Sequence, residues 1–436
     1  MLFVYELGAL LLLLVSLPIW LARALRHPGE VRERFGFGPR PEPAANGRRP
    51  LWIHAASLGE LDAAQALLEA MPEALRPPVV VTTLSSAARR RAAGTVPSAY
   101  APQTAPLDTW PTRLAFWCRV KPRALVLIET ELWPGWMAQA RRAGVPAAIV
   151  SARISERNWR RMSRFLPLVR ALFEGGAAVV GAQTALDLER LDRLGLAPGS
   201  VTGNLKHRGR VLPPHRAVES ERIWVVGSLR LGEEALLDVV ARRTRDFVIV
   251  APRHLRERAH WSESLAKREV EFRRASESAL VLPTPLELEE TNARENWVRR
   301  VRTEFASGPR VLYLDLHGQL PSWYALADVA TVGGTFVPIG GHNLFEAARW
   351  STPLCFGVST ENVSDLADAL VESGGATRTL DADAVARWLE RMDDIGERTT
   401  AALAAGETAR RAALGAARTL QLLSALPQFR GDGSAP

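Results

Sequence analysis

The chain has 436 residues, of which 47% are apolar, and its formal net charge is +8. A chain of this length usually forms more than one hydrophobic core, so two domains are expected. Its two cysteines, Cys118 and Cys355, lie far apart in sequence, which excludes a disulfide scaffold or a clustered-cysteine zinc site and favours a reducing compartment. A positive charge suits an anionic membrane, a phosphorylated substrate or nucleic acid. Nucleic acid is not expected, because no basic block interleaved with aromatic residues occurs.

The first apolar stretch, Leu2–Ala22, contains one acidic residue, Glu6, and arginines follow it. Its uncharged part, Leu7–Ala22, is short for a full membrane span. A signal peptide is not favoured, because the positive charge follows the apolar run and no small-residue cleavage site is clear. We expect a membrane anchor over residues 1–24, as a marginal span or an interfacial helix, with a buried core helix as the alternative. The arginines predict that the remainder lies in the cytoplasm.

From Leu51 onward, strand patterns alternate with helical patterns such as Leu61–Leu75 and Trp133–Arg142. The predicted strands of the first half are Leu51–Ala55, Pro78–Leu84, Ala124–Ile128, Ala147–Ser151 and Ala177–Ala182. Alternation of this kind predicts a parallel sheet with helices on both faces. Residues 25–206 are therefore expected to form one α/β domain.

A charged segment with two adjacent prolines, residues 207–221, is predicted to be an interdomain linker. The predicted strands beyond it are Ile223–Gly227, Phe247–Ala251, Ala279–Leu282, Val311–Leu314, Asp328–Val332 and Pro353–Phe356. They predict a second doubly wound domain over residues 222–400. An amphipathic helix over 401–425 is expected to pack back across both domains, and residues 426–436 are expected to form a frayed tail.

The most distinctive stretch is VGGTFVPIGGHNLFEAA, residues 332–348. A predicted buried strand ends at a glycine pair, a loop and a second glycine pair follow, and a helical pattern opens at Asn343. Glycines let backbone amides approach a phosphate closely, and a helix N-terminus presents unpaired N–H groups. The stretch predicts a phosphate or nucleotide site. A βα turn whose glycines only ease packing is the alternative.

Further candidates also follow predicted strands, where open α/β sheets bind their ligands. Glu60 lies at the start of a helix and is either a favourable first-turn charge or a general base. Glu129 and Glu131 follow the strand Ala124–Ile128, and alternation predicts that they point to the same side. Repulsion between them would raise the pKa of one carboxyl. A first-turn helix charge is the alternative for Glu131.

Basic side chains follow other strands. Lys206 is predicted to neutralise a phosphate or a carboxylate, with a solvated charge as the alternative. Arg253 offers a planar fork for phosphate, and His254 offers a donor. The pair Asp381 and Asp383 superficially resembles a metal motif, but it precedes a helical pattern, so capping explains it better. No metal site is therefore expected.

Taken together, these stretches resemble those of the 3-deoxy-D-manno-octulosonic acid (Kdo) transferases. The matching stretches are WIHAASLGE (52–60), ETELWP (129–134), SARIS (151–155), TGNLK (202–206), APRH (251–254) and VGGTFVPIGGHNLFEAA (332–348). They occur in the order of the family and run over most of the chain. A chance resemblance of several motifs in one order is not expected.

The resemblance implies a GT-B glycosyltransferase, with two Rossmann-like domains, a cleft between them and an anchor in the inner membrane. It implies inverting transfer of Kdo from CMP-Kdo to the lipid A precursor in lipopolysaccharide biosynthesis, without a metal or other cofactor. By the family pattern Glu60 is the general base, and Glu129 and Lys206 support the transition state. The CMP-binding positions that it implies are Ser228, Pro252, Arg253, His254, Gly318, Gln319, Leu320, Gly341, His342, Asn343, Leu344, Phe345 and Glu346.

The sequence departs from the family pattern at two places. Gln319 stands in Gly-Gln-Leu where the family usually has Gly-Glu-Leu, and Leu229-Arg230 replaces a Thr-His pair. Both places lie near the expected nucleotide, which leaves the contacts of Gln319 and Arg230 open. Two rival functions are another GT-B enzyme that uses a UDP- or ADP-sugar and a non-catalytic, membrane-bound nucleotide- or lipid-binding protein.

Overall fold

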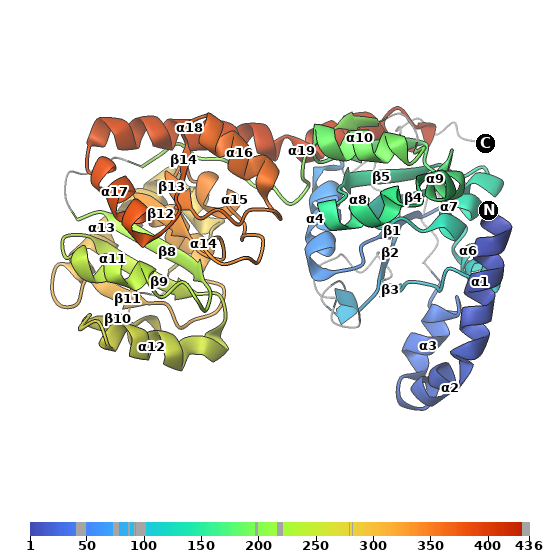
Figure 1. Cartoon of the computed structure of the whole chain (residues 1–436), viewed down its shortest axis with the longest axis horizontal. Helices are drawn as coiled ribbons and strands as arrows, with labels where there is room; N and C mark the ends of the chain where they lie inside the picture. The colour runs from blue at the N-terminus through green and yellow to red at the C-terminus, as the bar shows by residue number, and fades with distance from the viewer. Residues whose placement is uncertain are drawn as a thin grey trace. The chain divides into compact units, whose positions relative to one another are not determined.

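The computed structural model describes residues 1–40, 49–72, 78–85, 88–90, 92, 102–196, 199–215, 221–278, 280 and 282–429. The chain divides into two compact units, of which unit 1 comprises Met1–Arg208 and Leu414–Pro436, and unit 2 comprises Gly209–Ala413. Figure 1 shows that each unit has a sheet with helices on its two faces. Both predicted doubly wound α/β folds are therefore confirmed.

Unit 1 has a parallel seven-stranded sheet in the order β3-β2-β1-β4-β5-β6-β7. Its strands are β1 (Leu51–His54), β2 (Val79–Thr83), β3 (Gln103–Thr104), β4 (Ala124–Ile128), β5 (Ala147–Ala152), β6 (Val179–Ala182) and β7 (Gly199–Val201). All five strands predicted here are present. The central strand β4 consists of five buried apolar residues, as a parallel strand covered on both faces requires.

Helices cover both faces of this sheet and bury a separate apolar cluster on each. Among the described residues, the helices of unit 1 include α1 (Leu2–Val15), α2 (Leu17–Arg26), α3 (Pro28–Arg34), α4 (Leu58–Ala70), α6 (Trp110–Val120), α7 (Pro134–Arg142), α8 (Glu156–Ser163), α9 (Leu166–Phe173), α10 (Ala185–Arg193) and α19 (Gly415–Leu423). Helices α4 and α19 pack together on one face. Helices α6, α7, α9 and α10 contribute to the cluster on the other face.

The apolar N-terminal segment forms two helices, because Pro18 begins a new helix after Ser16. Among the described helices, none is long and apolar enough by itself to cross a bilayer, and only the pair α1–α2, bent by 57°, meets that requirement. One side of α1 forms polar contacts with the remainder of unit 1. The hydroxyl of Tyr5 donates a hydrogen bond of 2.7 Å to Asp108, and Glu6 pairs with the buried Arg113.

Unit 2 repeats the architecture with a parallel seven-stranded sheet in the order β10-β11-β9-β8-β12-β13-β14. Its strands are β8 (Ile223–Leu229), β9 (Phe247–Pro252), β10 (Phe272–Arg274), β11 (Val311–Tyr313), β12 (Val329–Val332), β13 (Leu354–Phe356) and β14 (Ala376–Arg378). Its α-helices are α11 (Leu236–Arg242), α12 (Arg258–Ala266), α13 (Thr291–Phe305), α14 (Leu320–Leu326), α15 (Phe345–Ala348), α16 (Ser364–Glu372), α17 (Ala382–Arg391) and α18 (Ile395–Ala413).

The described structure differs from the sequence predictions at several places. The expected strand over Ala279–Leu282 is not formed by Leu280 or Leu282, and its other two residues lie outside the described residues. The segment predicted as one helix over 401–425 is two helices, because α18 ends at Ala413 in unit 2 and α19 begins at Gly415 in unit 1.

The predicted linker begins by packing on unit 2. The N–H of Leu212 donates to the carbonyl of Arg349, and the hydroxyl of Ser351 donates to the carbonyl of Leu212. Residues 216–220, the end of the helical pattern at 73–77 and the tail from 430 lie outside the described residues.

Candidate functional site

In unit 1, Glu60 lies in the first turn of α4, just after β1. Ser57 is the N-cap, and its hydroxyl oxygen accepts a hydrogen bond from the Glu60 N–H. The Glu60 carboxylate accepts hydrogen bonds of 2.7 Å from the Ala56 N–H and 2.9 Å from the Ser57 hydroxyl. This reciprocal pattern resembles a capping box, with the N–H of Ala56 in the place of the N–H of the N-cap. Glu60 is thus an acidic residue in the first turn of a helix, as the alternative for it requires, and these bonds fix the carboxylate at the end of the strand.

The electrostatic environment of Glu60 also suits a proton acceptor. Burial raises the pKa of its carboxyl, and the negative charges of Glu131 and Glu129 raise it further. Hydrogen bonds from Ala56 and Ser57 lower the pKa, but the net shift is upward. A carboxylate whose pKa is raised is a stronger base than an ordinary carboxylate and accepts a proton more readily.

Glu129 and Lys206 form an ion pair close to this turn. Glu129 follows β4 with φ at +59°, an uncommon left-handed conformation for a residue other than glycine. The ammonium of Lys206 would lie 3.4 Å from a Cβ added at Gly59, so it borders the first turn of α4. Glu60 and Glu129 follow the neighbouring strands β1 and β4, and the loop after the edge strand β7 brings Lys206 to them at the carboxyl edge of the same sheet.

A residue near the end of β5 forms a hydrogen bond with the loop that contains Lys206. Ser151 is buried, and its φ of +52° is also left-handed. Its hydroxyl oxygen accepts a hydrogen bond of 3.2 Å from the N–H of Leu205, and Gln183 donates to its carbonyl. The SARIS and TGNLK motifs therefore contact one another, and Ser151 fixes the backbone beside Lys206.

Glu131 belongs to a second network at this end of the sheet. The Trp52 indole donates to the Thr82 hydroxyl oxygen, so that hydroxyl is free to donate to Nδ1 of His54 at 2.9 Å. A neutral His54 then carries its proton on Nε2, which lies 3.3 Å from Glu131. Burial lowers the pKa of His54, although Glu131 opposes the shift. Trp133 donates a further hydrogen bond of 2.8 Å to Glu131.

We expected repulsion between Glu129 and Glu131 to raise the pKa of one of the two carboxyls. For Glu131 this expectation is wrong. Burial acts to raise the pKa of Glu131, but the hydrogen bonds from His54 and Trp133 outweigh it, and the net pKa is lowered. Glu129 instead pairs with Lys206. The two carboxylates therefore have different partners, and the repulsion acts on Glu60.

In unit 2, the turn at the first glycine pair of the Gly-rich stretch binds a carboxylate from the same unit. The buried carboxylate of Glu233 accepts hydrogen bonds from the N–H groups of Gly334 (2.9 Å), Phe336 (3.0 Å) and Arg230 (2.8 Å). Burial raises the pKa of Glu233, although these backbone donors oppose the shift. The amides of this turn are therefore occupied and do not form the phosphate site predicted for the whole stretch.

The second glycine pair and the two residues after it leave three amides available. Gly340 donates to the hydroxyl oxygen of Ser359 at 2.8 Å, but the described residues offer no acceptor to the N–H groups of Gly341, His342 and Asn343. Gly340 and Gly341 both have positive φ values, +91° and +84°, which glycine adopts without strain. An anion would thus find its donors at residues 341–343.

The helix after this loop begins at Phe345, two residues later than the helical pattern that was predicted to open at Asn343. Its N-cap is Leu344 and it runs only over Phe345–Ala348, so a helix dipole contributes little. Asn343 accepts a hydrogen bond from the Phe345 N–H and donates to Glu346 at 3.2 Å. Burial raises the pKa of Glu346, whereas Asn343 and Arg253 lower it, with a net rise.

Basic side chains at the ends of β8 and β9 surround this loop. The Arg230 guanidinium donates to Nε2 of His254, and both burial and Arg230 lower the pKa of that imidazole. Burial and the charges of Arg253 and Arg230 lower the pKa of His342 to about 4, so His342 is neutral at pH 7. Arg253 is exposed, and its N–H donates to the carbonyl of Leu229. Arg230, which departs from the family pattern, therefore takes part in this basic cluster.

The remaining predicted positions lie beside it. A Cβ added at Gly227, next to Ser228, would lie 3.0 Å from the Leu320 side chain. Gly318 has φ at +80°, Gln319 caps α14, and α14 contacts both β8 and α15. Pro252 is the last residue of β9. The positions predicted for CMP thus gather at the carboxyl ends of the strands of unit 2.

The structure also identifies residues that the sequence interpretation did not assign, namely Ser151, His54 and Glu233. The Gly-Glu-Glu run at 232–234 was the available signal for Glu233, because an acid beside a glycine can fill a nest of amides. Asp381 caps α17 by accepting from the Ala384 N–H, as predicted. Within the described ranges, no group of three or more His, Cys, Asp or Glu side chains is arranged to hold a metal ion.

Comparisons with known proteins agree with the resemblance seen in the sequence. A family model described as 3-deoxy-D-manno-octulosonic-acid transferase (kdotransferase) matches residues 29–208. A 3-deoxy-D-manno-octulosonic acid transferase of Bordetella pertussis is 31% identical over 402 residues, which cover 85% of this chain and 86% of that protein. The transferase of the same name from Haemophilus influenzae is 26% identical and covers 87% of each chain.

Among solved structures, HepE of Anabaena in complex with UDP resembles the fold with a TM-score of 0.55. The alignment covers 87% of this chain and all of that one at 12% identity, so the likeness concerns the fold alone. It spans both units. The expected GT-B glycosyltransferase fold is confirmed.

Proposed function

The chain belongs to the 3-deoxy-D-manno-octulosonic acid (Kdo) transferase family, and we propose that it moves Kdo from CMP-Kdo to a lipid A precursor, with Glu60 as general base. It is therefore a glycosyltransferase. The observation that supports this mechanism best is the gathering of Glu60, Glu129 and Lys206 at the carboxyl edge of one sheet. A UDP- or ADP-sugar enzyme is not favoured, because the similar curated relatives are named as Kdo transferases.

Glu60 has the task of accepting the proton of the acceptor hydroxyl. As that oxygen forms its bond to the anomeric carbon of Kdo, the bond from this carbon to the phosphate breaks, and CMP leaves with the electron pair. The cap keeps the Glu60 carboxylate at the strand end, and its raised pKa strengthens it as a base. Lys206 offers a positive charge to the carboxylate of Kdo, and Glu129 holds that ammonium in position.

Unit 2 has the task of binding the leaving group. The free amides of Gly341, His342 and Asn343 are donors for a phosphate, and Arg253 supplies a positive charge. Glu233 supports them indirectly, because it fixes the preceding turn. Fixed donors of this kind stabilise the negative charge that develops on the phosphate of CMP.

We also propose that the protein associates with the inner membrane, with both units on the cytoplasmic side. A lipid acceptor has its reactive sugar at a membrane surface, and α1 exposes large apolar side chains such as Phe3, Leu12 and Val15. Arginines follow on α2 and α3, where they suit an anionic surface.

The test is transfer by the purified protein. CMP-Kdo is supplied with and without the tetraacylated lipid A precursor in detergent, while CMP release is followed by chromatography and the lipid by mass spectrometry. We expect CMP release only with acceptor, and a lipid heavier by Kdo. Transfer from UDP- or ADP-sugars in place of CMP-Kdo would refute the donor, and CMP-Kdo binding without any transfer would refute the enzymatic role.

A further inference from the structure

Helix α8 and the residue after it carry arginines that no acid in the described structure pairs with, whereas Arg170 on α9 pairs with Glu174. Residues 156–173 contain five arginines and one acidic residue, Glu156. Glu156 pairs with Arg160 and with Arg190. In the described part of the chain, no carboxylate lies within ion-pair distance of Arg157, Arg161 or Arg164. Their guanidinium groups are therefore available to an anionic partner.

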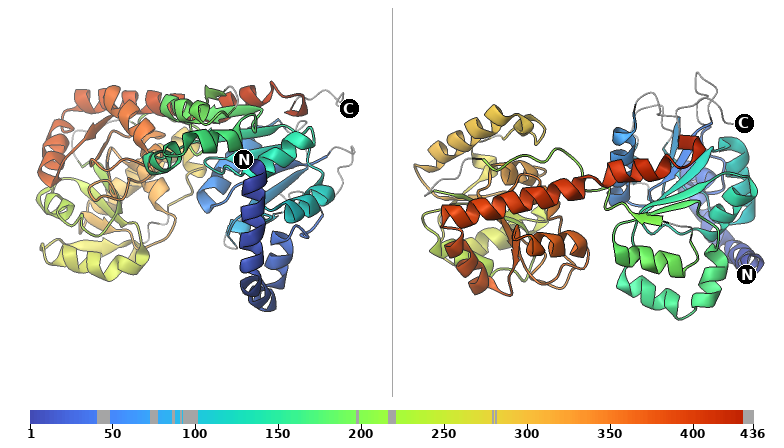
Figure 2. Two further views of the ribbon diagram at one scale, coloured as in Figure 1. Left: turned by 45° about the vertical axis from the view of Figure 1, so that its right-hand side comes forward. Right: turned by 90° about the horizontal axis from the view of Figure 1, so that it is seen from above.

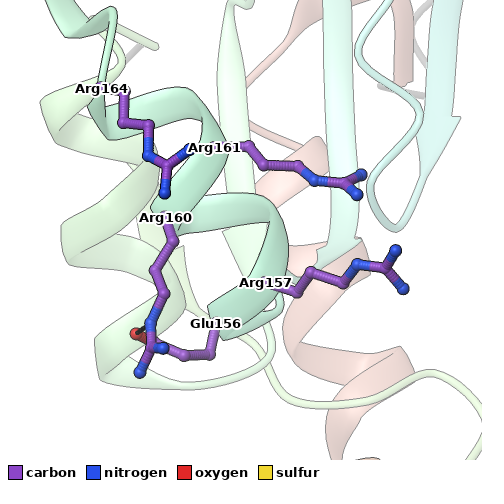
Figure 3. Close-up of a pocket in the computed structure, with 5 residues that line it drawn as sticks. All are labelled: Glu156, Arg157, Arg160, Arg161 and Arg164. Atoms are coloured by element: carbon purple, nitrogen blue, oxygen red, sulfur yellow. Dashed lines mark hydrogen bonds and ion pairs between the residues drawn. The ribbon is translucent and has the colours of Figure 1, made fainter.

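These side chains form one surface. Figure 3 shows that Arg157 and Arg161 project from one side of α8, whereas Arg160 and Arg164 project from the other side together with Glu156. These five residues line a shallow surface pocket. Because Arg157, Arg161 and Arg164 are exposed, their charges are hydrated and have no structural task in the core. An exposed arginine by itself is ordinary, but four over eight residues form a local positive field.

Apolar side chains accompany this charge. Phe165 follows Arg164 and is 63% exposed, and Leu168 on α9 is 45% exposed. Helices that lie in the headgroup region of a bilayer typically combine bulky apolar side chains with arginines or lysines.

The surface continues toward the N-terminal helix within unit 1. Helix α7 contacts both α9 and α1, and a pocket at their junction is lined by Leu2, Ala138, Arg141 and Leu172. Figure 2 likewise shows the start of α1 beside α9. The start of α1 and the end of α9 are thus neighbours.

We propose that α8 and α9 form a second membrane contact, which binds the phosphates of anionic phospholipids through Arg157, Arg161 and Arg164. This inference rests on the proposed membrane association and adds an electrostatic component to it. An apolar segment by itself gives reversible binding, and a basic patch nearby makes association stable and selective for anionic lipid. Phe165 and Leu168 enter the headgroup region beside the arginines.

The test compares two triple variants of the full-length protein. The first is Arg157→Gln, Arg161→Gln and Arg164→Gln. The matched control is Arg299→Gln, Arg300→Gln and Arg387→Gln, which removes the same charge from exposed positions of unit 2. Co-sedimentation measures binding to vesicles of phosphatidylcholine alone and to vesicles that also contain phosphatidylglycerol. A basic residue near an anionic surface contributes a factor of about five, so three together contribute on the order of a hundredfold.

We expect the affinity of the first variant for the vesicles that contain phosphatidylglycerol to fall by that factor, and its affinity for the phosphatidylcholine vesicles to stay unchanged. The control variant should bind both kinds of vesicle like the parent. The parent should also lose its preference for anionic vesicles at high salt. Equal losses in both variants, or a parent that binds both vesicles alike, would overturn the proposal. A raised KM for detergent-dispersed acceptor, with unchanged vesicle binding, would assign the surface to the acceptor instead. Transfer in detergent by the parent tests the proposed function separately.

Discussion

Replacing Glu233 by glutamine tests whether this buried carboxylate holds the Gly-rich loop in place. Its two oxygens accept three backbone hydrogen bonds of 2.8 to 3.0 Å, from Arg230, Gly334 and Phe336. A glutamine amide keeps one oxygen, but its NH₂ group must face an N–H donor, so one or two of these bonds are lost. Hydrogen bonds to a charged group contribute about 1.5–3 kcal/mol each.

Burial raises the pKa of Glu233 in spite of these donors, so the negative charge itself adds no net stability, and the cost of the substitution comes from the buried N–H groups that lose their acceptor. We therefore expect Glu233→Gln to lower the free energy of unfolding by about 1–3 kcal/mol. For a unit of this size the melting temperature should fall by about 2–10 °C. CMP affinity should also fall, because the turn leads directly to the amides of residues 341–343.

Calorimetry measures both quantities. The matched control is Glu234→Gln, which changes the neighbouring carboxylate that accepts from Gly232 and pairs with the half-exposed His260. Its effect should stay within about 1 kcal/mol. If Glu233→Gln melted and bound CMP like the parent while its fold was intact, the carboxylate would have no part in fixing the loop.

Three further predictions concern donor binding, pH and the N-terminus. Arg253→Ala should weaken CMP binding by about 1.5–3 kcal/mol in calorimetry, because a charge-assisted contact to the phosphate is lost, and unchanged affinity would exclude this contact. The acidic limb of kcat/KM should have an apparent pKa above 4.5, since only ionised Glu60 accepts a proton and its pKa is raised. A limb at or below 4.5 would contradict that assignment. Deleting residues 2–26 should weaken vesicle binding and lower the stability of unit 1 by about 1–3 kcal/mol, because the buried Arg113 loses Glu6. Unchanged unfolding in denaturant would show that α1 contributes nothing to unit 1.

The central strands of both sheets could be predicted from the sequence, whereas the edge strands could not. A parallel strand buried on both faces is a nearly continuous apolar run, as Ala124–Ile128 is. The missed strands β3, β7, β10 and β14 are the outermost strands of their sheets and have only two or three residues each. Such short segments have no apolar periodicity to detect.

The candidate site shows the same division between local and distant information. Glu60, Lys206 and Arg253 could be found because parallel sheets bind ligands where their strands end. The contact of Glu233 with Gly334 joins residues about a hundred positions apart in sequence, and that of Ser151 with Leu205 joins residues 54 positions apart. Sequence periodicity does not indicate which distant residues contact one another, so these hydrogen-bond partners are identified only in the folded structure. The lowered pKa of Glu131 was missed because it depends on the distant His54.

The most direct test of the central claim is transfer by Glu60→Gln, measured beside Glu287→Gln. Glu287 makes a comparable set of local hydrogen bonds at an exposed position of unit 2, because its carboxylate accepts from the N–H and the hydroxyl of Thr284 and its N–H donates to that hydroxyl. Both changes should cost at most about 1 kcal/mol of stability, because glutamine keeps an acceptor for the cap. If Glu60 is the base, its variant should lose about a hundredfold to ten-thousandfold in transfer with CMP affinity preserved, whereas Glu287→Gln should be fully active. Transfer by Glu60→Gln at nearly the parent rate would show that this carboxylate only caps its helix, and it would contradict the mechanism.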